Sequence, residues 1–366
     1  MMRSVLNIIT LLSISQRIVF TNKLIYATGN NFMKSVFPTS YSTLSSSALA
    51  SAISIQYGFE NLQCRFILRG VGDTYLLETS KDKYVLRIYR SSHRSLADVE
   101  AETVLLSKLR EEGVSVSYPI SDKSGKMVQE FVAAEGLRYG VVFSFAEGNS
   151  VNQLTETQMR NFGKEMARFH NVSSVIQLDH SPRVFDINTT LDQPLTLIKQ
   201  AFSDDQAGYA WLMEAAEQVK QKIEQTDSSD FPTGYCQFDF LPKNFHFDSN
   251  DKITFFDFDF FGHGWLVNDI MTFWVHLTLD VFFNRMTQEA ADKSLSVFVE
   301  AYREHRKISD AELALVPYLS LGFWLFYMGF HTTHDQFYPF IFQPAQLKMR
   351  VNVIKQLMER YWSKVT

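Results

Sequence analysis

The chain has 366 residues, a formal net charge of −5 at pH 7, and hydrophobic residues at 46% of its positions. This length predicts a globular protein with two lobes, because one compact core rarely extends over so many residues. The mildly acidic charge and the lack of a long basic run exclude an ordinary nucleic-acid groove, so no nucleic-acid partner is expected.

Residues 1–32 are expected to be a leader or an over-long start, and not a part of the fold. Residues 1–15 resemble a short secretory leader, but their apolar stretch is too short to span a bilayer. Met33 begins a segment that is more typical of a folded protein. The two cysteines, Cys64 and Cys236, give no disulfide framework. We therefore predict a cytoplasmic protein without stable membrane association, and secretion is the alternative.

Residues 33–145 are expected to form a small lobe. A helical lead-in is predicted over residues 34–56, and Ser95 is a predicted N-cap for a helix that Gly113 ends. Short runs rich in β-forming residues are bounded by turn residues, which predicts antiparallel strands. The predicted strands occupy residues 62–68, 74–79, 84–89, 127–132 and 138–145.

Residues 146–366 are expected to form a larger, mainly helical lobe, so the predicted fold class is α+β. Helices are predicted over residues 159–169 and 209–225. A β-rich segment over residues 235–261 interrupts the helical pattern. The remainder of the chain predicts helices rich in Phe, Trp and Tyr, of which the one over residues 315–330 is expected to be buried.

The segment 235–270 carries the residues best suited to chemistry. Asp239 precedes a short loop, and Asn244 opens a strand that turns and returns as the strand before Asp257. Pairing across such a hairpin would bring the Asn244 amide oxygen close to the Asp257 carboxylate. Mg²⁺ prefers a few oxygen ligands of this kind, completed by water and phosphate oxygens. Asp239 would stay free to accept a proton from a hydroxyl group.

This segment resembles the catalytic loop of the aminoglycoside phosphotransferase and choline kinase superfamily, His-x-Asp-x-x-x-x-Asn followed by an Ile-Asp-Phe/Trp metal motif. The resemblance implies a bilobal protein-kinase-like fold, a catalytic Asp239, and Asn244 and Asp257 as metal ligands. It also implies that Asp269 supports the loop, while Asp259 either faces the metal from further away or caps the strand. A half-buried strand with solvated acids would be the simpler explanation of Asp257 and Asp259, but it would not explain Asp239 and Asn244 upstream.

One position departs from the family pattern. Gln237 stands where the family usually has His, and Phe238 stands where it commonly has Gly. In kinases that His holds the loop through hydrogen bonds, and Gln can donate and accept similar bonds. The substitution is the best argument from the sequence for a weakened or inactive kinase.

The small lobe offers candidate nucleotide-binding residues. Gly70 and Gly72 lie between two predicted strands, where glycines would let backbone N–H groups approach the ATP phosphates. Arg87 lies on the third predicted strand, where kinases place a lysine that pairs with the phosphates. Val85, on the same strand face, could cover the adenine. Glu102 is the expected ion-pair partner of Arg87, and Glu100 is the competing candidate, which the helix face would decide.

The predicted fifth strand resembles the hinge strand of this superfamily. Adenine would then bond to backbone groups near Ser144, Phe145 and Ala146. Most of the chain after Tyr57 shares the resemblance, weakly in the small lobe and well at residues 235–270.

The acceptor is less well specified. Aromatic and polar residues of the large lobe could bind a cationic head group through cation–π contacts, although burial in the core is the simpler explanation. The residues concerned are Trp265, Trp274, His276, Asp280, Trp324, Tyr327, His331 and His334. The region lacks a dense acidic run, so an amino alcohol, homoserine-like or choline-like acceptor is expected in preference to an aminoglycoside.

We therefore predict an ATP- and Mg²⁺-dependent kinase that phosphorylates a hydroxyl group of a small molecule. A nucleotide-binding pseudokinase scaffold is the first alternative, because Gln237 replaces the family His. A protein Ser/Thr kinase on the same fold is the second, but the short stretch between Asp257 and Asp269 leaves little room for a regulated activation loop.

Overall fold

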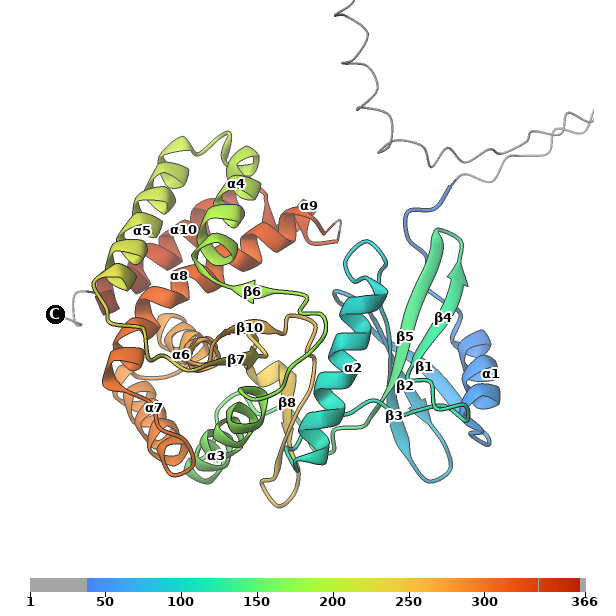
Figure 1. Ribbon diagram of the computed structural model, residues 1–366. Helices are drawn as coiled ribbons and strands as arrows, with labels where there is room; N and C mark the ends of the chain where they lie inside the picture. The colour runs from blue at the N-terminus through green and yellow to red at the C-terminus, as the bar shows by residue number, and fades with distance from the viewer. Residues whose placement is uncertain (1–37, 335, 363–366) are drawn as a thin grey trace, which may run out of the picture. The chain divides into compact units, whose positions relative to one another are not determined.

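A five-stranded antiparallel sheet forms the first part of the fold in the computed structural model, which describes residues 38–334 and 336–362 (Figure 1). The chain divides into two units, Met1–Ser40 and Tyr41–Thr366, and the fold described here belongs to the second. The expected leader at residues 1–32 lies outside the described residues. The strands are β1 (Gln63–Arg69), β2 (Asp73–Glu78), β3 (Lys83–Ile88), β4 (Val128–Ala133) and β5 (Gly136–Ser144), in the order β1-β2-β3-β5-β4. All five expected strands are confirmed.

Helices cover both faces of this sheet. Side chains alternate between the two faces of a strand, so Val141 of β5 packs with α2 (Leu96–Glu111), whereas Val142 packs with α1 (Ser46–Tyr57). The α1 helix begins later than expected, because the Ser45 hydroxyl caps it and residues 38–45 are not helical. The predicted N-cap of α2 is confirmed: Ser95 forms a capping box with Asp98.

The rest of the chain is mainly helical, as expected, with two small β structures. The predicted helices over residues 159–169 and 209–225 are both present; the first extends beyond both limits, and the second begins earlier and ends one residue before the expected end. The helices are α3 (Glu156–Ser173), α4 (Gln193–Ile198), α5 (Gln206–Glu224), α6 (Val267–Phe282), α7 (Gln288–Arg303), α8 (Asp310–Thr332), α9 (Tyr338–Ile341) and α10 (Pro344–Tyr361). The short strands are β6 (Val184–Phe185), β7 (Thr233–Cys236), β8 (Phe245–Phe247), β9 (Ile253–Phe255) and β10 (Gly262–Trp265). They form the sheet β6-β10-β7 and the hairpin β8-β9.

A tight connection joins the five-stranded sheet to the helical part. After β5, the chain passes Gly148 and pairs with β8, because the N–H of Asn149 donates to the Phe247 carbonyl at 3.1 Å and the return bond is 3.0 Å. Gly148 has φ 97, and a Cβ there would lie 2.0 Å from the Phe247 carbonyl oxygen. Glycine is therefore required at this position.

The α8 helix is long and apolar enough to cross a membrane by length and composition, and no other helix of the described residues meets this test. However, 56% of its most apolar window is buried inside the protein, where it packs with α6 and α4. A mostly buried apolar helix is typical of a protein core, as expected for residues 315–330.

An aromatic cluster fills the core beneath β8 and β9. Phe162 of α3 is fully buried, and its ring centroid lies 4.7 Å from that of Phe245, 4.9 Å from Phe273 and 5.2 Å from Phe298. Edge-to-face and tilted contacts of this kind add to the stabilisation from apolar burial. Phe162 thus links the helices to the hairpin that carries the candidate metal ligands.

We expect Phe162→Ala to lower the free energy of unfolding by about 3–5 kcal/mol, because it removes a buried ring and leaves a cavity. Urea unfolding followed by fluorescence would measure the loss. Val175→Ala removes an exposed side chain, 76% accessible, and should change stability by less than about 0.5 kcal/mol. Equal effects of the two substitutions would contradict this account of the core.

Candidate active site

One cavity of about 610 Å³, here called the central cavity, brings together most of the predicted site residues. The predicted residues that line it are Gly70, Val85, Arg87, Glu102, Phe145, Ala146, Asp239, Asn244, Asp257 and Asp259. The predicted residues that do not line it are Gly72, Ser144, Gln237 and Asp269. The cavity therefore combines side chains from the five-stranded sheet with side chains from the 235–270 segment.

The β8-β9 hairpin places Asn244 and Asp257 at the same end. Phe245 pairs with Phe255, and the N–H of Phe256 donates to the Asn244 carbonyl at 3.0 Å. The next residue, Asp257, adopts a left-handed backbone conformation with φ 61, which turns the chain away from the strand. The hairpin predicted from the sequence is confirmed.

Asp239 is buried and held by two neighbours. Its Oδ2 accepts hydrogen bonds from Asn244 Nδ2 at 2.7 Å and from Lys243 Nζ at 2.8 Å. Its Oδ1 is buried without a hydrogen-bond partner. Burial raises the pKa of the Asp239 carboxyl, and the Lys243 ammonium opposes this rise. A buried carboxylate oxygen with a vacant lone pair is well placed to accept a hydrogen bond from an incoming hydroxyl group.

Gln237 joins the catalytic loop to the strand that carries Asp257. Its Nε2 donates to the carbonyls of Phe256 at 3.0 Å and Asp257 at 3.1 Å, and its Oε1 accepts from the N–H of Asp239 at 3.0 Å. The side chain is fully buried, and all three bonds are to backbone. One amide thus provides two donors and one acceptor at the position where the family usually has His.

Asp269 holds the same loop from below. Its Oδ1 accepts from the N–H of Phe238 at 2.7 Å, and its Oδ2 accepts from the N–H of Gln237 at 3.0 Å and from His170 Nε2 at 3.1 Å. His170 Nδ1 in turn lies 2.8 Å from the Tyr302 hydroxyl. Burial lowers the pKa of His170, which favours a neutral ring. The carboxylate therefore supports the loop and does not reach the central cavity.

Phe238 shows why the family commonly has Gly at this point. Its backbone is left-handed, with φ 61, a conformation that costs free energy in a residue with a side chain. The ring is fully buried and stacks on Phe185 with centroids 3.8 Å apart. This stacking, together with the bond from its N–H to Asp269, offsets the backbone cost.

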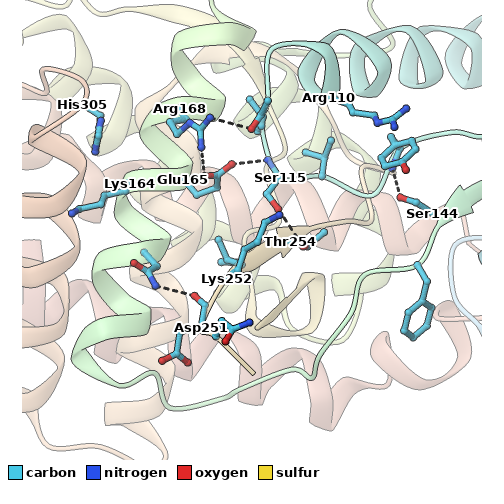
Figure 2. A pocket seen from close by; sticks show the side chains of 18 residues that line it. Arg110, Ser115, Ser144, Lys164, Glu165, Arg168, Asp251, Lys252, Thr254 and His305 are labelled. Atoms are coloured by element: carbon cyan, nitrogen blue, oxygen red, sulfur yellow. Dashed lines mark hydrogen bonds and ion pairs between the residues drawn. The ribbon is translucent and has the colours of Figure 1, made fainter. Parts of the chain in front are cut away.

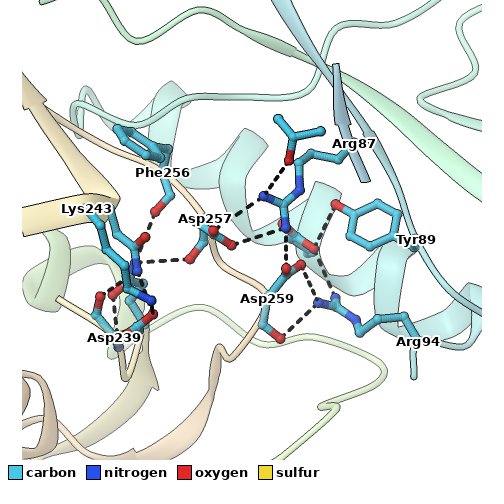
Figure 3. A network of polar contacts seen from close by, with 12 residues as sticks. Arg87, Tyr89, Arg94, Asp239, Lys243, Phe256, Asp257 and Asp259 are labelled. Atoms are coloured by element: carbon cyan, nitrogen blue, oxygen red, sulfur yellow. Dashed lines mark hydrogen bonds and ion pairs between the residues drawn. The ribbon is translucent and has the colours of Figure 1, made fainter. Parts of the chain in front are cut away.

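The expected ion pair between Arg87 and Glu102 is wrong. Arg87 instead contacts Asp257, with nitrogen–oxygen distances of 3.3 and 3.4 Å, and forms a closer ion pair with Asp259. Glu102 pairs with Arg94, which approaches it at 3.0 Å. Arg94 lies just before α2, the helix that carries Glu102, and it occupies the Glu102 carboxylate. Arg87 is paired instead with the two aspartates. Figure 3 shows Arg87 and Arg94 on one side of Asp257, and Asp239 and Lys243 on the other.

Asp259 is the centre of this charged network and not a simple strand cap. Its carboxylate meets Arg87 and Arg94, and its carbonyl accepts from Arg94 at 3.0 Å and from Arg183 at 2.8 Å. Burial raises its pKa, and the three arginines oppose that rise. For Asp257, burial acts in the same direction, but Arg87 and Lys243 leave its pKa below the usual value. Asp257 is therefore the carboxylate that stays ionised at the cavity surface.

The donor set fits a magnesium site completed by phosphate and water. The Asp257 side chain is 32% exposed towards the central cavity, and Asn244 borders it. Among residues 38–334 and 336–362, no group of three or more His, Cys, Asp or Glu side chains could hold a metal ion. Mg²⁺ commonly binds through one or two protein oxygens and substrate phosphates, which suits this arrangement.

Only some of the residues expected to bind the nucleotide in the glycine hairpin and the hinge strand line the central cavity. Gly70 lines the central cavity, whereas a Cβ on Gly72 would lie 2.7 Å from the Ile88 carbonyl oxygen, so Gly72 serves close packing. Both backbone groups of Ser144 are already bonded, the N–H to Tyr118 and the carbonyl to the Ser117 hydroxyl. The Ala146 carbonyl likewise lies 2.8 Å from His246 Nδ1, so backbone groups of Phe145 and the N–H of Ala146 are the candidates for adenine contacts.

A second cavity of about 750 Å³ lies behind the hinge (Figure 2). It shares Ser144 and Phe145 with the hinge, and Figure 2 shows Arg168 bonded to Glu165, which also accepts from the N–H of Ser115. Asp239, Asn244 and Asp257 do not line it. The larger cavity is therefore not the centre of the chemistry.

Sequence reasoning missed several residues of the central cavity and its network. Lys243 could have been found, because it directly precedes Asn244 in the loop. Arg94 and Arg183 carry no local signal, since each reaches the site from a separate part of the chain, whereas His246 lies on β8, two residues after Asn244. His246 Nδ1 lies 2.8 Å from the Ala146 carbonyl, so it links β8 to the hinge.

Comparison with known proteins agrees with this geometry. A model of the family described as "Phosphotransferase enzyme family" matches residues 63–308. A homoserine kinase of Bradyrhizobium sp. (strain BTAi1) is 26% identical over 272 residues, which cover 72% of this chain and 76% of that protein. The solved structure of amicoumacin kinase hAmiN, in complex with AMP-PNP, Ca²⁺ and Ami, has a TM-score of 0.69 at 21% identity and covers 86% of this chain and 93% of its own.

A microcompartment-associated aminopropanol kinase also has a TM-score of 0.69 at 21% identity, covering 87% of this chain and 98% of its own. At this identity the solved structures show a shared fold, and they confirm the expected protein-kinase-like α+β fold. The resemblance found from the catalytic-loop residues is likewise confirmed by the family match.

We expect Gln237→Leu to lower both stability and affinity for Mg²⁺-ATP, because it leaves two buried carbonyls and one buried N–H without partners. Each unsatisfied group costs about 1–3 kcal/mol. Thermal unfolding and calorimetric titration with the nucleotide would measure the two effects. Gln237→His should retain part of both properties, because an imidazole can donate and accept.

Gln225→Leu is the matched control, since Gln225 is exposed at the end of α5 and should tolerate the same change. Wild-type stability in Gln237→Leu would show that the three bonds do not hold the loop.

Proposed function

Given that the chain belongs to the phosphotransferase enzyme family and is a small-molecule kinase, we propose that it transfers the γ-phosphoryl group of ATP to a hydroxyl group of an amino alcohol, homoserine-like or choline-like acceptor. One observation carries this proposal: Asp239, Asn244 and Asp257 line a single cavity together with Arg87. Three oxygen-bearing side chains and a cation in one cavity are the parts that phosphoryl transfer requires.

In the proposed reaction, the acceptor hydroxyl oxygen attacks the γ-phosphorus. A new oxygen–phosphorus bond forms, the bond from the γ-phosphorus to the bridging oxygen breaks, and ADP leaves. Asp239 orients the hydroxyl and receives its proton. Its unpartnered Oδ1 is the atom available for this contact, because Oδ2 is occupied by Lys243 and Asn244.

The metal would be held by Asn244 and Asp257. When bound, Mg²⁺ neutralises charge on the phosphate oxygens. Asn244 already donates hydrogen bonds to Asp239. These bonds fix the position of the proposed metal ligand relative to the proposed proton acceptor. The solved amicoumacin kinase complex contains AMP-PNP and Ca²⁺, which supports a nucleotide and a divalent ion in this fold.

The nucleotide would lie between the glycine hairpin and the hinge. Arg87 contacts Asp257 at 3.3–3.4 Å, distances long enough that a phosphate could compete for the guanidinium. Val85 would cover the adenine, and Phe145 and Ala146 would offer backbone groups to it. Gly70 leaves room for the backbone to approach the phosphates.

The pseudokinase alternative is weakened by the bonds of Gln237. The amide holds both Asp239 and the Asp257 strand, so the loss of the family His does not leave the loop unsupported. The protein kinase alternative is not favoured by any contact in the cavity. A cytoplasmic location remains a proposal, supported by the need for ATP and by two free thiols at Cys64 and Cys236.

We expect Asp239→Asn to lower kcat for acceptor phosphorylation by about 10²–10⁴-fold, because the amide cannot accept the proton. Nucleotide affinity should change little. A coupled assay of ADP release with a panel of small hydroxyl compounds would measure the rate, and calorimetry would measure the affinity. Identical residual ATP turnover in the wild type and the variant would favour the scaffold.

We expect Asp257→Asn to raise the Mg²⁺ concentration that gives half-maximal activity by about tenfold or more, because it removes an ionised ligand. Activity measured against free Mg²⁺ at saturating ATP would show the shift. Asp204→Asn changes an exposed carboxylate far from the cavity and serves as the control. An unchanged Mg²⁺ requirement in Asp257→Asn would remove Asp257 from the metal site.

A further inference from the structure

Lys243 lies in the short turn that follows Asp239. It belongs to the single 3₁₀ turn Pro242–Asn244, and the Ser150 hydroxyl anchors this turn by donating to the Pro242 carbonyl at 2.6 Å. The Lys243 side chain returns over the turn, and its Nζ forms an ion pair with Asp239 Oδ2 at 2.8 Å. The turn therefore holds an ammonium group against the proposed proton acceptor.

This contact leaves much of the ammonium group open to the cavity. The Lys243 side chain is 61% accessible, whereas the Asp239 side chain is 4% accessible. Lys243 lines the central cavity, and among the residues that the structure describes its Nζ has an ion pair with Asp239 alone. An ammonium group has three N–H donors, so two of them remain for a ligand in the cavity.

A second cation lines the cavity, but it is already engaged by two carboxylates. Arg87 contacts Asp257 and Asp259, and Figure 3 shows Asp257 between Arg87 and Lys243. In the described part of the chain, these two are the arginine and lysine side chains that line the central cavity. Burial disfavours the ionised form of Asp257, but Arg87 and then Lys243 offset this and lower its pKa. Lys243 is thus the cation on the Asp239 side of the proposed metal ligand.

The phosphoryl group in transfer would come close to this ammonium group. In the proposed reaction it passes to a hydroxyl group that Asp239 orients through Oδ1. The two oxygens of one carboxylate are adjacent, so an ammonium group bonded to Oδ2 lies within reach of a phosphoryl group that approaches a hydroxyl at Oδ1. Negative charge spreads over three equatorial oxygens in the transition state, and donors fixed at that place lower its free energy.

We propose that Lys243 is a catalytic residue that donates hydrogen bonds to the non-bridging oxygens of the γ-phosphoryl group during its transfer. The inference rests on the proposed function, because it takes Asp239 as the group that receives the hydroxyl proton. Lys243 keeps its own protons throughout. The bond from the acceptor oxygen to phosphorus forms, the bond to the bridging oxygen of ADP breaks, and the hydroxyl proton goes to Asp239.

A mimic of the transferring group tests this contact without an acceptor. Aluminium fluoride bound with Mg²⁺-ADP imitates the planar, anionic phosphoryl group. We expect Lys243→Met to weaken the calorimetric affinity for Mg²⁺-ADP with aluminium fluoride by about tenfold or more, and that for Mg²⁺-ADP alone by less than about twofold. Lys243→Arg should retain part of the affinity for the mimic. An equal loss for both ligands, or no loss for either, would overturn the contact.

Lys126→Met is the matched control. Lys126 is 52% accessible and forms an ion pair with Glu130 at 3.4 Å, but it does not line the central cavity. The substitution should leave both affinities unchanged. A loss equal to that in Lys243→Met would show that the effect is not specific to the cavity, and it would count against the proposal.

Kinetics in two backgrounds separate a direct contact from the positioning of Asp239. We expect Lys243→Met to lower kcat for acceptor phosphorylation by about 10²-fold with little change in the acceptor KM, because the contact is made mainly in the transition state. In the Asp239→Asn background the same substitution should still lower kcat by about tenfold or more. A lysine that acts only through Asp239 would have no effect there, and that result would overturn the proposal. The double variant removes the buried charge together with its partner, so it should fold even if Lys243→Met alone is unstable.

The proposed function would fail by a different result. Acceptor phosphorylation in the wild type no faster than in Asp239→Asn would overturn the transfer reaction with Asp239 as the proton acceptor. The binding comparison with aluminium fluoride needs no turnover, so it tests the Lys243 contact in either case.

Discussion

The site depends on the bonds that hold three consecutive backbone units, those of Gln237, Phe238 and Asp239. These residues cannot form a regular ladder, because Phe238 is left-handed and the chain must present Asp239 to the cavity. Buried N–H groups without partners would make such a loop costly. Asp269 accepts from two of the three N–H groups, and the Gln237 side chain accepts from the third. The same amide also reaches the Asp257 strand, so one side chain fixes the spacing between the two candidate catalytic carboxylates.

A second constraint comes from charge. Asp257 and Asp259 are two residues apart and approach the same arginine, so their mutual repulsion must be compensated. Arg87 comes from the five-stranded sheet, and Arg94 from the segment just before α2, whereas both aspartates belong to the 235–270 segment. The ion pairs therefore join the two parts of the fold across the cavity. Breaking one partner of such a buried pair would leave an uncompensated charge.

The spacing of Asp239, Asn244 and Asp257 could be interpreted from the sequence because a short hairpin carries all three, and local pairing decides their positions. The ion-pair partner of Arg87 could not be predicted from the sequence. Glu102, Asp257 and Asp259 are equally reasonable partners until the positions of the sheet, α2 and the hairpin are known. The backbone bonds of Ser144 to Ser117 and Tyr118 were not foreseen for a similar reason, because they join segments that no local pattern brings together. Residues whose role depends on a single element are predictable, and residues that compete for partners between elements are not.

The aromatic helices at the end of the chain also contain residues whose surroundings could not be predicted from a local sequence pattern. Tyr327 and His331 lie in an apolar helix, and a core assignment was the simpler expectation for the aromatic residues of 315–330, which include Tyr327. Helical periodicity records which face is apolar, but it cannot show that one stretch of that face borders a cavity. The hydroxyl of Tyr327 and the Nδ1 of His331 are vacant because the cavity, and not another element, lies opposite them. In the central cavity, the carboxylates of Asp239, Asp257 and Asp259 come from the 235–270 segment, whereas α8 contributes mainly aromatic side chains.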